Sequence, residues 1–363
     1  MSVIDKKSKI LVAMSGGVDS SVAAYLLKEE GHDVVGVTMC LGIIDLENDS
    51  KVKCCGTEAI NDAKNVCQKL GVPHYVLDFS ADLENMVIKD FVDEYMHGRT
   101  PNPCVRCNEY LKFGKLLEYT KNMGFDFLAT GHYSRIKEVD GDYLLCRPKD
   151  SKKDQTYFLY SIKKANLSKI LFPLSDFTKD EIRDIAHAAD LTVESKLESQ
   201  DVCFVPDNDY KRFVSERIGK IESGDIVNMS GDVLGKHKGI INYTRGQRGG
   251  LGVAVGRPQY VVEIDAENNR IIVGEKEDLL TNSLIASNVN MLIDDCPQRV
   301  FVQIRYGHKQ ALCSLDFIEG NKVSIVFDAP QEAVTKGQSV VFYNNNMVLG
   351  GGTIESYSEK GMA

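Results

Sequence analysis

Hydrophobic and polar positions in the first 130 residues alternate between two periods. Short apolar runs predict strands at residues 10–14, 34–39, 74–79 and 125–130. Segments with apolar residues at helical spacing predict helices at residues 19–30, 57–70, 81–97 and 109–122. This order predicts a mostly parallel, doubly wound sheet with helices on both faces. Residues 41–53 have little periodicity and are expected to form a surface loop.

The pattern changes along the second half of the chain. Thr178 and Glu181 form a capping-box sequence before an expected helix at 179–189, and residues 210–218 predict a short linking helix. After Glu222, β-rich runs between Gly-Asp and Asn-Asn turns predict strands at residues 260–264, 270–273, 299–305, 322–327 and 339–343. This part is therefore expected to be all-β, in two small units that meet near Thr281. The predicted domains are residues 1–208, 209–281 and 282–363.

Composition places the chain among ordinary globular proteins. Its 363 residues are 43% hydrophobic and 26% charged, which predicts two or three domains with buried cores. No run of 18 apolar residues predicts a membrane span, and the N-terminus lacks the apolar stretch of a signal peptide. We therefore expect a cytoplasmic protein without a membrane partner. The formal charge of −9 argues against a surface that is basic all over, but a nucleic acid needs only a local basic face.

The strongest chemical signal is the sequence Ser-Gly-Gly-Val-Asp-Ser at residues 15–20, between the first predicted strand and helix. Glycines let the backbone approach a ligand closely, and a helix N-terminus offers N–H groups to an anion. Ser15 and Ser20 add hydroxyl groups, and Asp19 is a candidate ligand for Mg²⁺. The segment predicts a phosphate cradle. It is not a Walker A loop, because the lysine of that motif is absent.

Cysteines supply the second signal. Ten cysteines are too few for a disulfide scaffold and are expected to be thiols. Cys104 and Cys107 form a C-x-x-C in a segment that is expected to be a loop rigidified by two prolines, where Arg106 is expected to favour a thiolate. Cys203 lies in a polar segment that begins at Ser199. We interpret Cys107 and Cys203 as reactive. For the other cysteines a structural role is favoured. Cys40, Cys67, Cys146 and Cys313 are expected in the core, Cys54 and Cys55 on a polar loop, and Cys296 in a turn.

Together these motifs resemble known families. The cradle at residues 15–20 resembles that of the PP-loop ATP pyrophosphatases, which cleave ATP between the α and β phosphates. The whole chain, from Ala13 to Gly352, resembles the tRNA-specific 2-thiouridylases (MnmA/TrmU). That resemblance rests on segments at residues 13–20, 36–39, 98–103, 107–108, 112–113, 129–133, 153–155, 157–159, 203–204, 243–248, 305–306 and 337–339. It implies a PP-loop α/β domain followed by all-β central and barrel-like C-terminal domains.

The resemblance also implies roles for individual residues. ATP is expected at Ala13, Met14, Ser15, Gly16, Gly17, Val18, Asp19, Ser20, Met39 and Gly131. Asn102, Pro103 and Cys104 are expected to face the target base. His132, Lys153, Asp154, Gln155, Arg305, Tyr306 and Gln338 are expected to contact tRNA. Cys203 is expected to carry a persulfide and Cys107 to resolve it, leaving a disulfide between the two.

The implied reaction is ATP-dependent 2-thiolation of the wobble uridine (U34) of tRNA, with AMP and PPi as the other products. ATP, Mg²⁺, a tRNA of the Lys, Glu or Gln type and a cysteine desulfurase or sulfur-relay protein are the expected cofactors and partners. Three basic segments, at residues 147–153, 236–248 and 299–309, are candidates for the tRNA face. The all-β C-terminal part is expected to position tRNA.

Two positions depart from the family pattern. Many members have Asp where this chain has Cys104, which puts the base contact there in doubt and adds a third thiol. Gly249 stands where a lysine is expected, which removes one cation from a region expected to contact phosphate.

Other interpretations remain open at this point. Cys104, Cys107 and Cys203 are three candidate ligands for a 4Fe-4S cluster, and a zinc site is a weaker variant because such sites normally have four ligands. A non-enzymatic alternative is an RNA-binding module regulated by an adenine nucleotide.

Overall fold

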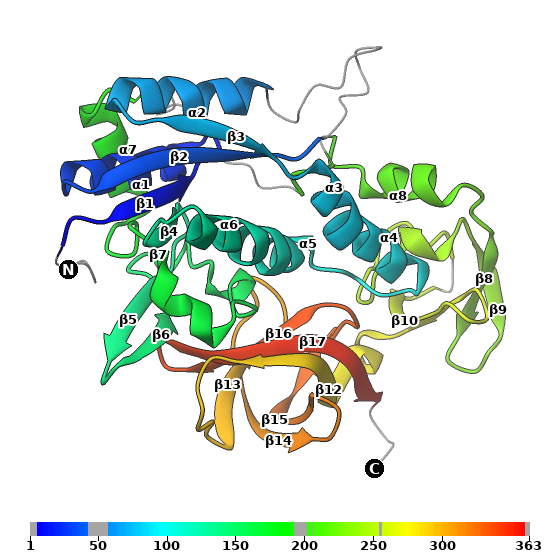
Figure 1. Ribbon diagram of the computed structural model, residues 1–363. Coiled ribbons are helices and arrows are strands. Elements are labelled where there is room, and N and C mark those ends of the chain that lie inside the picture. Colours follow the sequence, from blue (N-terminus) through cyan, green and yellow to red (C-terminus); the bar gives the residue numbers. More distant parts are fainter. Residues whose placement is uncertain (1–5, 43–56, 192–201, 206, 254–255, 360–363) are drawn as a thin grey trace. The chain divides into compact units, whose positions relative to one another are not determined.

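The structure is a computed structural model that describes residues 6–42, 57–191, 202–205, 207–253 and 256–359. It divides into two compact units (Figure 1). Unit 1 comprises residues 1–86, 104–206 and 346–348, and unit 2 comprises residues 87–103, 207–345 and 349–363. Most of the expected loop at 41–53, the pair Cys54 and Cys55, and Ser199 to Asp201 lie outside the described residues. The three-domain division stays a prediction.

Unit 1 is built on the predicted parallel sheet. Its strands are β1 (Lys9–Ala13), β2 (Asp33–Cys40), β3 (His74–Asp78), β4 (Phe127–Thr130) and β7 (Ile170–Leu171), in the order β3-β2-β1-β4-β7. Every neighbouring pair is parallel. Successive strands run outward from β1 to β2 and β3 on one side and to β4 on the other. The carboxyl end of β1 is therefore the topological switch point, where ligands bind in open sheets of this kind.

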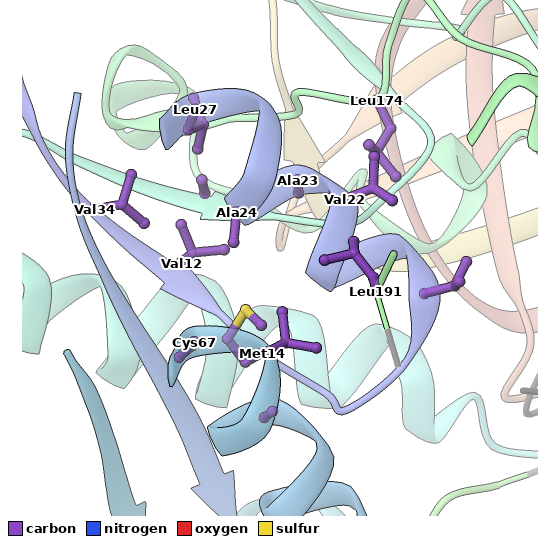
Figure 2. Close-up of a cluster of buried hydrophobic side chains, with 14 of the residues drawn as sticks. Val12, Met14, Val22, Ala23, Ala24, Leu27, Val34, Cys67, Leu174 and Leu191 are labelled. Atoms are coloured by element: carbon purple, nitrogen blue, oxygen red, sulfur yellow. The ribbon is translucent and has the colours of Figure 1, made fainter. Parts of the chain in front are cut away.

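Helices cover both faces of this sheet. Helices α1 (Val18–Glu29), α2 (Thr57–Leu70) and α7 (Lys179–Ala188) share one buried cluster with β1. Figure 2 shows Ala24 of α1 next to Val12, with Val22, Leu27 and Met14 in the same buried cluster. Side chains alternate along a strand, so Leu11, which is also buried, faces the opposite side. The predicted α/β fold is confirmed.

Two predicted helices are interrupted by wider π turns. The segment expected at 81–97 is α3 (Ser80–Leu83), a π-helix at Glu84–Ile88 and α4 (Lys89–Met96). The one expected at 109–122 begins earlier, with α5 (Pro103–Arg106), a π-helix at Cys107–Leu116 and α6 (Leu117–Asn122). The expectation that the C-x-x-C lies in a loop is therefore wrong. Proline suits the first position of a helix, because its missing N–H would have no intrahelical partner there.

Unit 1 also contains a β-hairpin that the sequence pattern did not reveal. It consists of β5 (Arg135–Val139) and β6 (Asp142–Cys146), which pair antiparallel across a turn at Asp140 and Gly141, both with positive φ. The end of the hairpin from Lys137 to Asp142 is exposed and mostly polar, so the segment has little apolar alternation. Short 3₁₀ turns follow at Thr156–Phe158 and Lys164–Lys169.

Unit 2 is mainly antiparallel β structure, as predicted. A four-stranded sheet has the order β10-β11-β8-β9, with β8 (Gly224–Asn228), β9 (Val233–His237), β10 (Tyr260–Asp265) and β11 (Arg270–Gly274). The remaining strands run in the order β12-β15-β14-β13-β16-β17, and pairing of β12 with β17 closes them into a six-stranded barrel. Their bounds are β12 (Leu280–Met291), β13 (Arg299–Gln303), β14 (Ala311–Ile318), β15 (Lys322–Glu332), β16 (Ser339–Asn344) and β17 (Met347–Glu359).

Helices are few in unit 2. The predicted linking helix is α8 (Tyr210–Ile218), whose Tyr210 ring stacks on Tyr95 of α4 at a centroid distance of 4.9 Å. Beyond α8, the described residues hold only 3₁₀ turns, at Ile240–Asn242 and Lys276–Leu279. In the described part of the chain, no helix has the length and apolar character needed to cross a membrane.

Candidate active site

The loop at residues 15–20 lies at the switch point of the unit 1 sheet. Gly17 is the N-cap of α1 and has an extended backbone, with φ −99° and ψ 167°, and no side chain caps the helix there in the described structure. Gly16 has a φ of +73°, and a Cβ at this position would lie 2.3 Å from the carbonyl oxygen of Ala59. Only glycine fits there. The first N–H groups of a 12-residue helix are thus left to an anion.

The two serine hydroxyls of this loop hold its shape. Ser20 Oγ accepts a hydrogen bond from the backbone N–H of Ser15 at 3.1 Å and donates one to the carbonyl oxygen of Gly17 at 3.1 Å. Ser15 Oγ lies 3.2 Å from Ser20 Oγ. These hydroxyls therefore fix the shape of the loop, and their expected contact with phosphate stays a prediction.

Neighbouring strands bring two more of the expected nucleotide residues to this edge of the sheet. Gly131 follows β4 and lies against the first turn of α1, because a Cβ there would be 2.7 Å from the Ser20 nitrogen. Met39 is near the carboxyl end of β2, which pairs in parallel with β1. Beside it, Thr38 Oγ1 donates to the carbonyl oxygen of Met14 at 3.0 Å.

Asp19 has partners that sequence reasoning missed. Lys179 Nζ lies 2.7 and 2.8 Å from its two carboxylate oxygens, and the Tyr133 hydroxyl donates to one of them at 2.8 Å. Lys179 is the first residue of α7, directly after the confirmed capping box of Thr178 and Glu181. Its side chain is 8% exposed, whereas that of Asp19 is 32% exposed. No local sequence signal connects two residues 160 positions apart.

The thiols of the C-x-x-C differ in exposure. Cys104, in the first turn of α5, is exposed, whereas Cys107 is 8% exposed. Burial raises the pKa of the Cys107 thiol, and the positive charge of Lys112 offsets part of this rise. Arg106, expected to favour the thiolate, instead lies 3.3 Å from Glu109. The cation near these sulfurs is therefore Lys112, one helical turn further on.

His132 lies between this helix and the carboxyl end of β4, the strand next to β1. Its Nε2 is 3.4 Å from Lys112 Nζ, and its Nδ1 is 2.7 Å from Thr130 Oγ1. Burial and the nearby Lys112 lower the pKa of His132 well below its usual range. The ring is therefore neutral at physiological pH, and an expected contact of His132 with tRNA would be a hydrogen bond rather than an ion pair.

Cys203 is exposed and belongs to unit 1, like Cys107. The two residues that follow it, Phe204 and Val205, are buried and anchor this segment. The four cysteines expected in the core, at residues 40, 67, 146 and 313, are all buried. Cys40 is disulfide-bonded, so the expectation that the cysteines are thiols is wrong at this position.

The described cysteines are not grouped as a metal site. Among the described residues, which include Cys104, Cys107 and Cys203, no three His, Cys, Asp or Glu side chains are grouped so that they could hold a metal ion. This arrangement does not fit an iron–sulfur cluster or a structural zinc ion. Mg²⁺ needs less from a protein, because one carboxylate with water and phosphate oxygens completes its coordination. Asp19 fits that requirement.

The residues expected to contact tRNA in unit 1 have internal partners. Asp154 forms an ion pair with Arg147 at 2.5 Å and accepts hydrogen bonds from the backbone and hydroxyl of Thr156. Gln155 Oε1 accepts a hydrogen bond from the Tyr133 N–H at 2.8 Å. The segment 153–155 is thereby tied to Tyr133, which contacts Asp19 of the cradle.

In unit 2 the expected tRNA residues differ in environment. Arg305 and Tyr306 are exposed in the loop after β13, Tyr306 at 48%. Gln338 instead donates from its side-chain amide to the carbonyl oxygens of Thr100 and Pro101. The next residues along the chain from that anchored segment are Asn102 and Pro103, the expected base contacts.

Ion pairs and burial engage several positive charges of the three basic segments. Arg147, Lys236 and Arg299 pair with Asp154, Asp225 and Asp328. Arg245 is buried, with its guanidinium 4.0 Å from the centre of the Tyr357 ring. The buried Arg245 thus has a structural role, and the assignment of the three segments to the tRNA face stays a prediction. Gly249 is exposed with open space at its Cβ, so the missing lysine is a lost surface charge.

Three family models match consecutive parts of the chain. They are described as a tRNA methyl transferase HUP domain at residues 8–207, a tRNA methyl transferase PRC-barrel domain at residues 211–275 and an aminomethyltransferase beta-barrel domain at residues 281–354. Among solved structures, a 4-thiouridine synthetase–RNA complex with bound ATP matches 58% of this chain and 50% of its own, at 16% identity and a TM-score of 0.37. That TM-score is too low to support an argument.

Similar proteins match over nearly the whole chain. The tRNA-specific 2-thiouridylase MnmA 1 of Syntrophus aciditrophicus is 53% identical over 350 residues, which cover 96% of this chain and 93% of that protein. The tRNA-specific 2-thiouridylase MnmA of Clostridium perfringens is 48% identical over 355 residues, 96% and 99% of the two chains. The chain therefore belongs to the tRNA-specific 2-thiouridylase family.

Proposed function

We propose that this protein is a tRNA sulfurtransferase that uses ATP to convert the wobble uridine (U34) of tRNA into 2-thiouridine. The observation that carries this proposal is that the phosphate cradle and both candidate sulfur-transfer thiols, Cys107 and Cys203, belong to the same compact unit. Membership of the 2-thiouridylase family supports the choice of tRNA as substrate and of sulfur as the transferred atom.

The proposed first step activates the base. The uridine O2 attacks the α-phosphorus of ATP, which forms a base–AMP ester and releases PPi. The loop at residues 13–20, Met39 and Gly131 would bind ATP, and the N-terminus of α1 favours its negative charge. Mg²⁺, held by Asp19 with phosphate oxygens, would neutralise phosphate charge when bound. The ester makes C2 electrophilic and gives it a leaving group.

The proposed second step transfers sulfur. The terminal sulfur of a Cys203 persulfide attacks C2, and AMP leaves. The Cys107 thiolate then attacks Cys203 Sγ, so that the sulfur–sulfur bond breaks and its electron pair stays on the thiouridine sulfur. The product is a Cys107–Cys203 disulfide, which a dithiol reductant must reduce by two electrons. A variant of this step has Cys107 release hydrosulfide from the persulfide, which then attacks C2.

The exposure of the two thiols agrees with these roles. Cys203 is exposed, as a thiol must be to receive sulfur from a cysteine desulfurase or a relay protein. Cys107 is buried and its pKa is raised, so it stays largely protonated at neutral pH and is protected from unrelated oxidants. Approach of a negative persulfide to the resolving thiol would be favoured by Lys112.

Recognition of tRNA is assigned to both units. An anticodon base is single-stranded and open to stacking and edge contacts. We assign target-base contact to Asn102, Pro103 and Cys104, and tRNA contact to His132, Lys153, Asp154, Gln155, Arg305, Tyr306 and Gln338. The tRNAs for Lys, Glu and Gln are the proposed substrates, and the cytoplasm, where tRNA is modified, is the proposed location.

The test is an anaerobic reaction of the purified protein with ATP, Mg²⁺, a persulfide donor and tRNA whose wobble base is uridine. We expect equimolar AMP and 2-thiouridine, detected by nucleoside mass spectrometry, and none with a tRNA that carries cytidine at position 34. Methylation without sulfur incorporation, or tRNA binding without AMP formation, would overturn the proposal. Iron and sulfide analysis of the same sample tests the cluster alternative, which requires both elements in an active enzyme.

A further inference from the structure

We propose that Cys104 is a second resolving thiol, which displaces Cys203 from its disulfide with Cys107 and leaves a Cys104–Cys107 disulfide in the C-x-x-C. This inference rests on the proposed function, whose second step ends in a Cys107–Cys203 disulfide. It gives Cys104 a role in dithiol exchange that is separate from its proposed contact with the target base. It also makes the C-x-x-C the site at which a dithiol reductant acts.

The first observation is the place of the two thiols in one helical run. Cys104 is the second residue of α5, and Cys107 is the first residue of the π-helix that continues α5 without a break. Side chains three positions apart share a helix face, with Cβ atoms about 5–6 Å apart. A disulfide needs Cα atoms roughly 4.4–6.8 Å apart, a separation that this spacing meets. The two sulfurs can therefore pair without a change of fold.

The second observation is the difference in exposure between the two thiols. Cys104 is exposed, whereas Cys107 is 8% exposed. A C-x-x-C in an α/β domain is typical of dithiol redox sites, and the reactive cysteine of such a site is accessible. Cys104 is therefore the member of the pair that an external thiol can reach.

The third observation concerns the surroundings of the pair. Within the part of the chain that the structure describes, no three His, Cys, Asp or Glu side chains are grouped so that they could hold a metal ion. Cys104 and Cys107 are both thiols in that part of the chain. Two thiols at disulfide spacing without such a group favour a redox pair over a metal cluster.

The proposed exchange keeps its electrons within the protein. The Cys104 thiolate attacks Cys107 Sγ, the bond between Cys107 and Cys203 breaks, and its electron pair leaves with Cys203, which takes a proton. Attack on Cys203 Sγ would instead expel Cys107. Burial raises the pKa of that thiol, which makes it a poor leaving group. Because the helix holds Cys104 near Cys107, this intramolecular step precedes attack by a reductant from solution.

The exchange frees Cys203 for a new persulfide before any reduction takes place. A dithiol reductant then attacks the exposed Cys104 sulfur, and Cys107 is released as a thiol. The second thiol of the reductant breaks the mixed disulfide, so that two electrons and two protons pass to the pair and the reductant becomes a disulfide. Sulfur loading and reduction thereby use different thiols.

The test maps the disulfides after one turnover. The full chain is loaded with persulfide, freed of the donor and given ATP, Mg²⁺ and tRNA with a wobble uridine, without reductant. Free thiols are blocked with N-ethylmaleimide, and trypsin, which cleaves after Arg106, places the three thiols in separate peptides for mass spectrometry. Per 2-thiouridine formed, the wild type should hold at least about tenfold more Cys104–Cys107 than Cys107–Cys203 disulfide.

Cys104→Asp is the informative variant, because a carboxylate cannot exchange with a disulfide. Per 2-thiouridine formed, this variant should retain the Cys107–Cys203 disulfide. Cys296→Ser is the matched control, since Cys296 is a partly exposed thiol of unit 2, and it should show the wild-type pattern. A wild type that holds the Cys107–Cys203 disulfide with Cys104 alkylated overturns the inference.

A second measurement needs no turnover. Cys203→Ser is treated with diamide, a thiol oxidant, in the absence of tRNA, and it should form the Cys104–Cys107 disulfide; its absence also overturns the inference. If the wild type forms no 2-thiouridine, the proposed function fails, and the exchange fails with it because its starting disulfide is never made. If 2-thiouridine forms but the Cys107–Cys203 disulfide persists in the wild type, only this inference fails.

Discussion

The side-chain amide of Gln338 donates hydrogen bonds to the carbonyl oxygens of Thr100 and Pro101, at 3.0 and 3.2 Å, across more than 230 residues of chain. The backbone continues this contact, because the Thr100 N–H donates to the carbonyl oxygen of Lys336 at 2.9 Å. Within unit 2, the segment that leads to Asn102 and Pro103 is therefore fastened to the segment before β16. This contact gives Gln338 a role in shaping the base-contact loop.

Substitution of Gln338 tests that role. Gln338→Ala removes two hydrogen bonds and should cost about 1–3 kcal/mol of unfolding free energy. Gln338→Glu should reduce thiolation at least as much, because a carboxylate would face two carbonyl oxygens. Thiolation rate at saturating ATP and ATP affinity are measured together; the rate should fall and the affinity should not change. Wild-type thiolation by Gln338→Glu would contradict the donor role.

Asp19 should be essential for ATP turnover. Asp19→Ala leaves the buried Lys179 ammonium without its carboxylate and should lower the free energy of unfolding by about 3–5 kcal/mol. The variant should also lose ATP turnover. Asp19→Asn keeps the shape and some hydrogen bonding, so it should fold better and still form no AMP. Ser15→Ala should fold and also fail. Near-normal AMP formation by Asp19→Asn and Ser15→Ala would exclude the PP-loop assignment.

Substitution of the three thiols should affect thiolation differently. Cys203→Ser and Cys107→Ser should each lose thiolation while the ATP site stays intact. Cys104→Asp should remain active, because Cys104 is exposed in the first turn of α5 and an acidic residue is favoured at that end of a helix. Thiolation is measured by nucleoside mass spectrometry. Full activity of either serine variant contradicts the two-thiol mechanism, and loss of both iron and activity in Cys104→Ala would favour the cluster.

Alkylation should report the protonation of Cys107. Burial raises the pKa of this thiol, and only the thiolate reacts with iodoacetamide. Its alkylation rate should therefore be low at neutral pH and should level off only at a higher pH than the alkylation rate of a free cysteine does. The stability that the buried thiol contributes is present at neutral pH and is lost as pH rises through the raised pKa.

The variant Lys112→Met tests what causes the remaining reactivity of Cys107. Lys112→Met removes the cation that offsets the effect of burial, so Cys107 should react more slowly still at each pH. Trypsin cleaves after Arg106, which places Cys104 and Cys107 in different peptides that mass spectrometry quantifies separately. A rate for Cys107 that does not change in Lys112→Met would contradict this electrostatic effect.

The loop after β13 should contribute to tRNA affinity. Arg305→Ala should weaken tRNA binding and reduce the slope of log affinity against log salt by about 1, the value for one phosphate contact. Tyr306→Ala should weaken binding with little change in slope, because stacking on a base is not ionic. Lys276→Ala, at a surface ion pair with Glu332, is the control and should leave affinity unchanged. Wild-type affinity in both loop variants would remove this loop from the tRNA site.

The sequence by itself determined the elements whose signals are local. Periodicity and glycine stops predicted α1, α2 and strands β1 to β3 almost to the residue, and the capping box predicted the start of α7. The order of strands and helices was enough for a parallel sheet, because right-handed crossovers leave few alternatives. The phosphate cradle could also be predicted from the sequence, since its strand, loop and helix are consecutive in the chain.

Tertiary structure alone decided which distant residues meet. The sheet order places β4 beside β1 and so brings Gly131 against α1, and packing of α7 brings Lys179 to Asp19. The π turns that carry the C-x-x-C into a helix depend on packing, not on local propensity. The sequence likewise did not reveal which cations RNA can reach. Arg305 is exposed to solvent, whereas Arg245 is buried against the Tyr357 ring, and no local sequence pattern distinguishes the two. These outcomes depend on contacts between segments far apart in the chain, which no local pattern encodes.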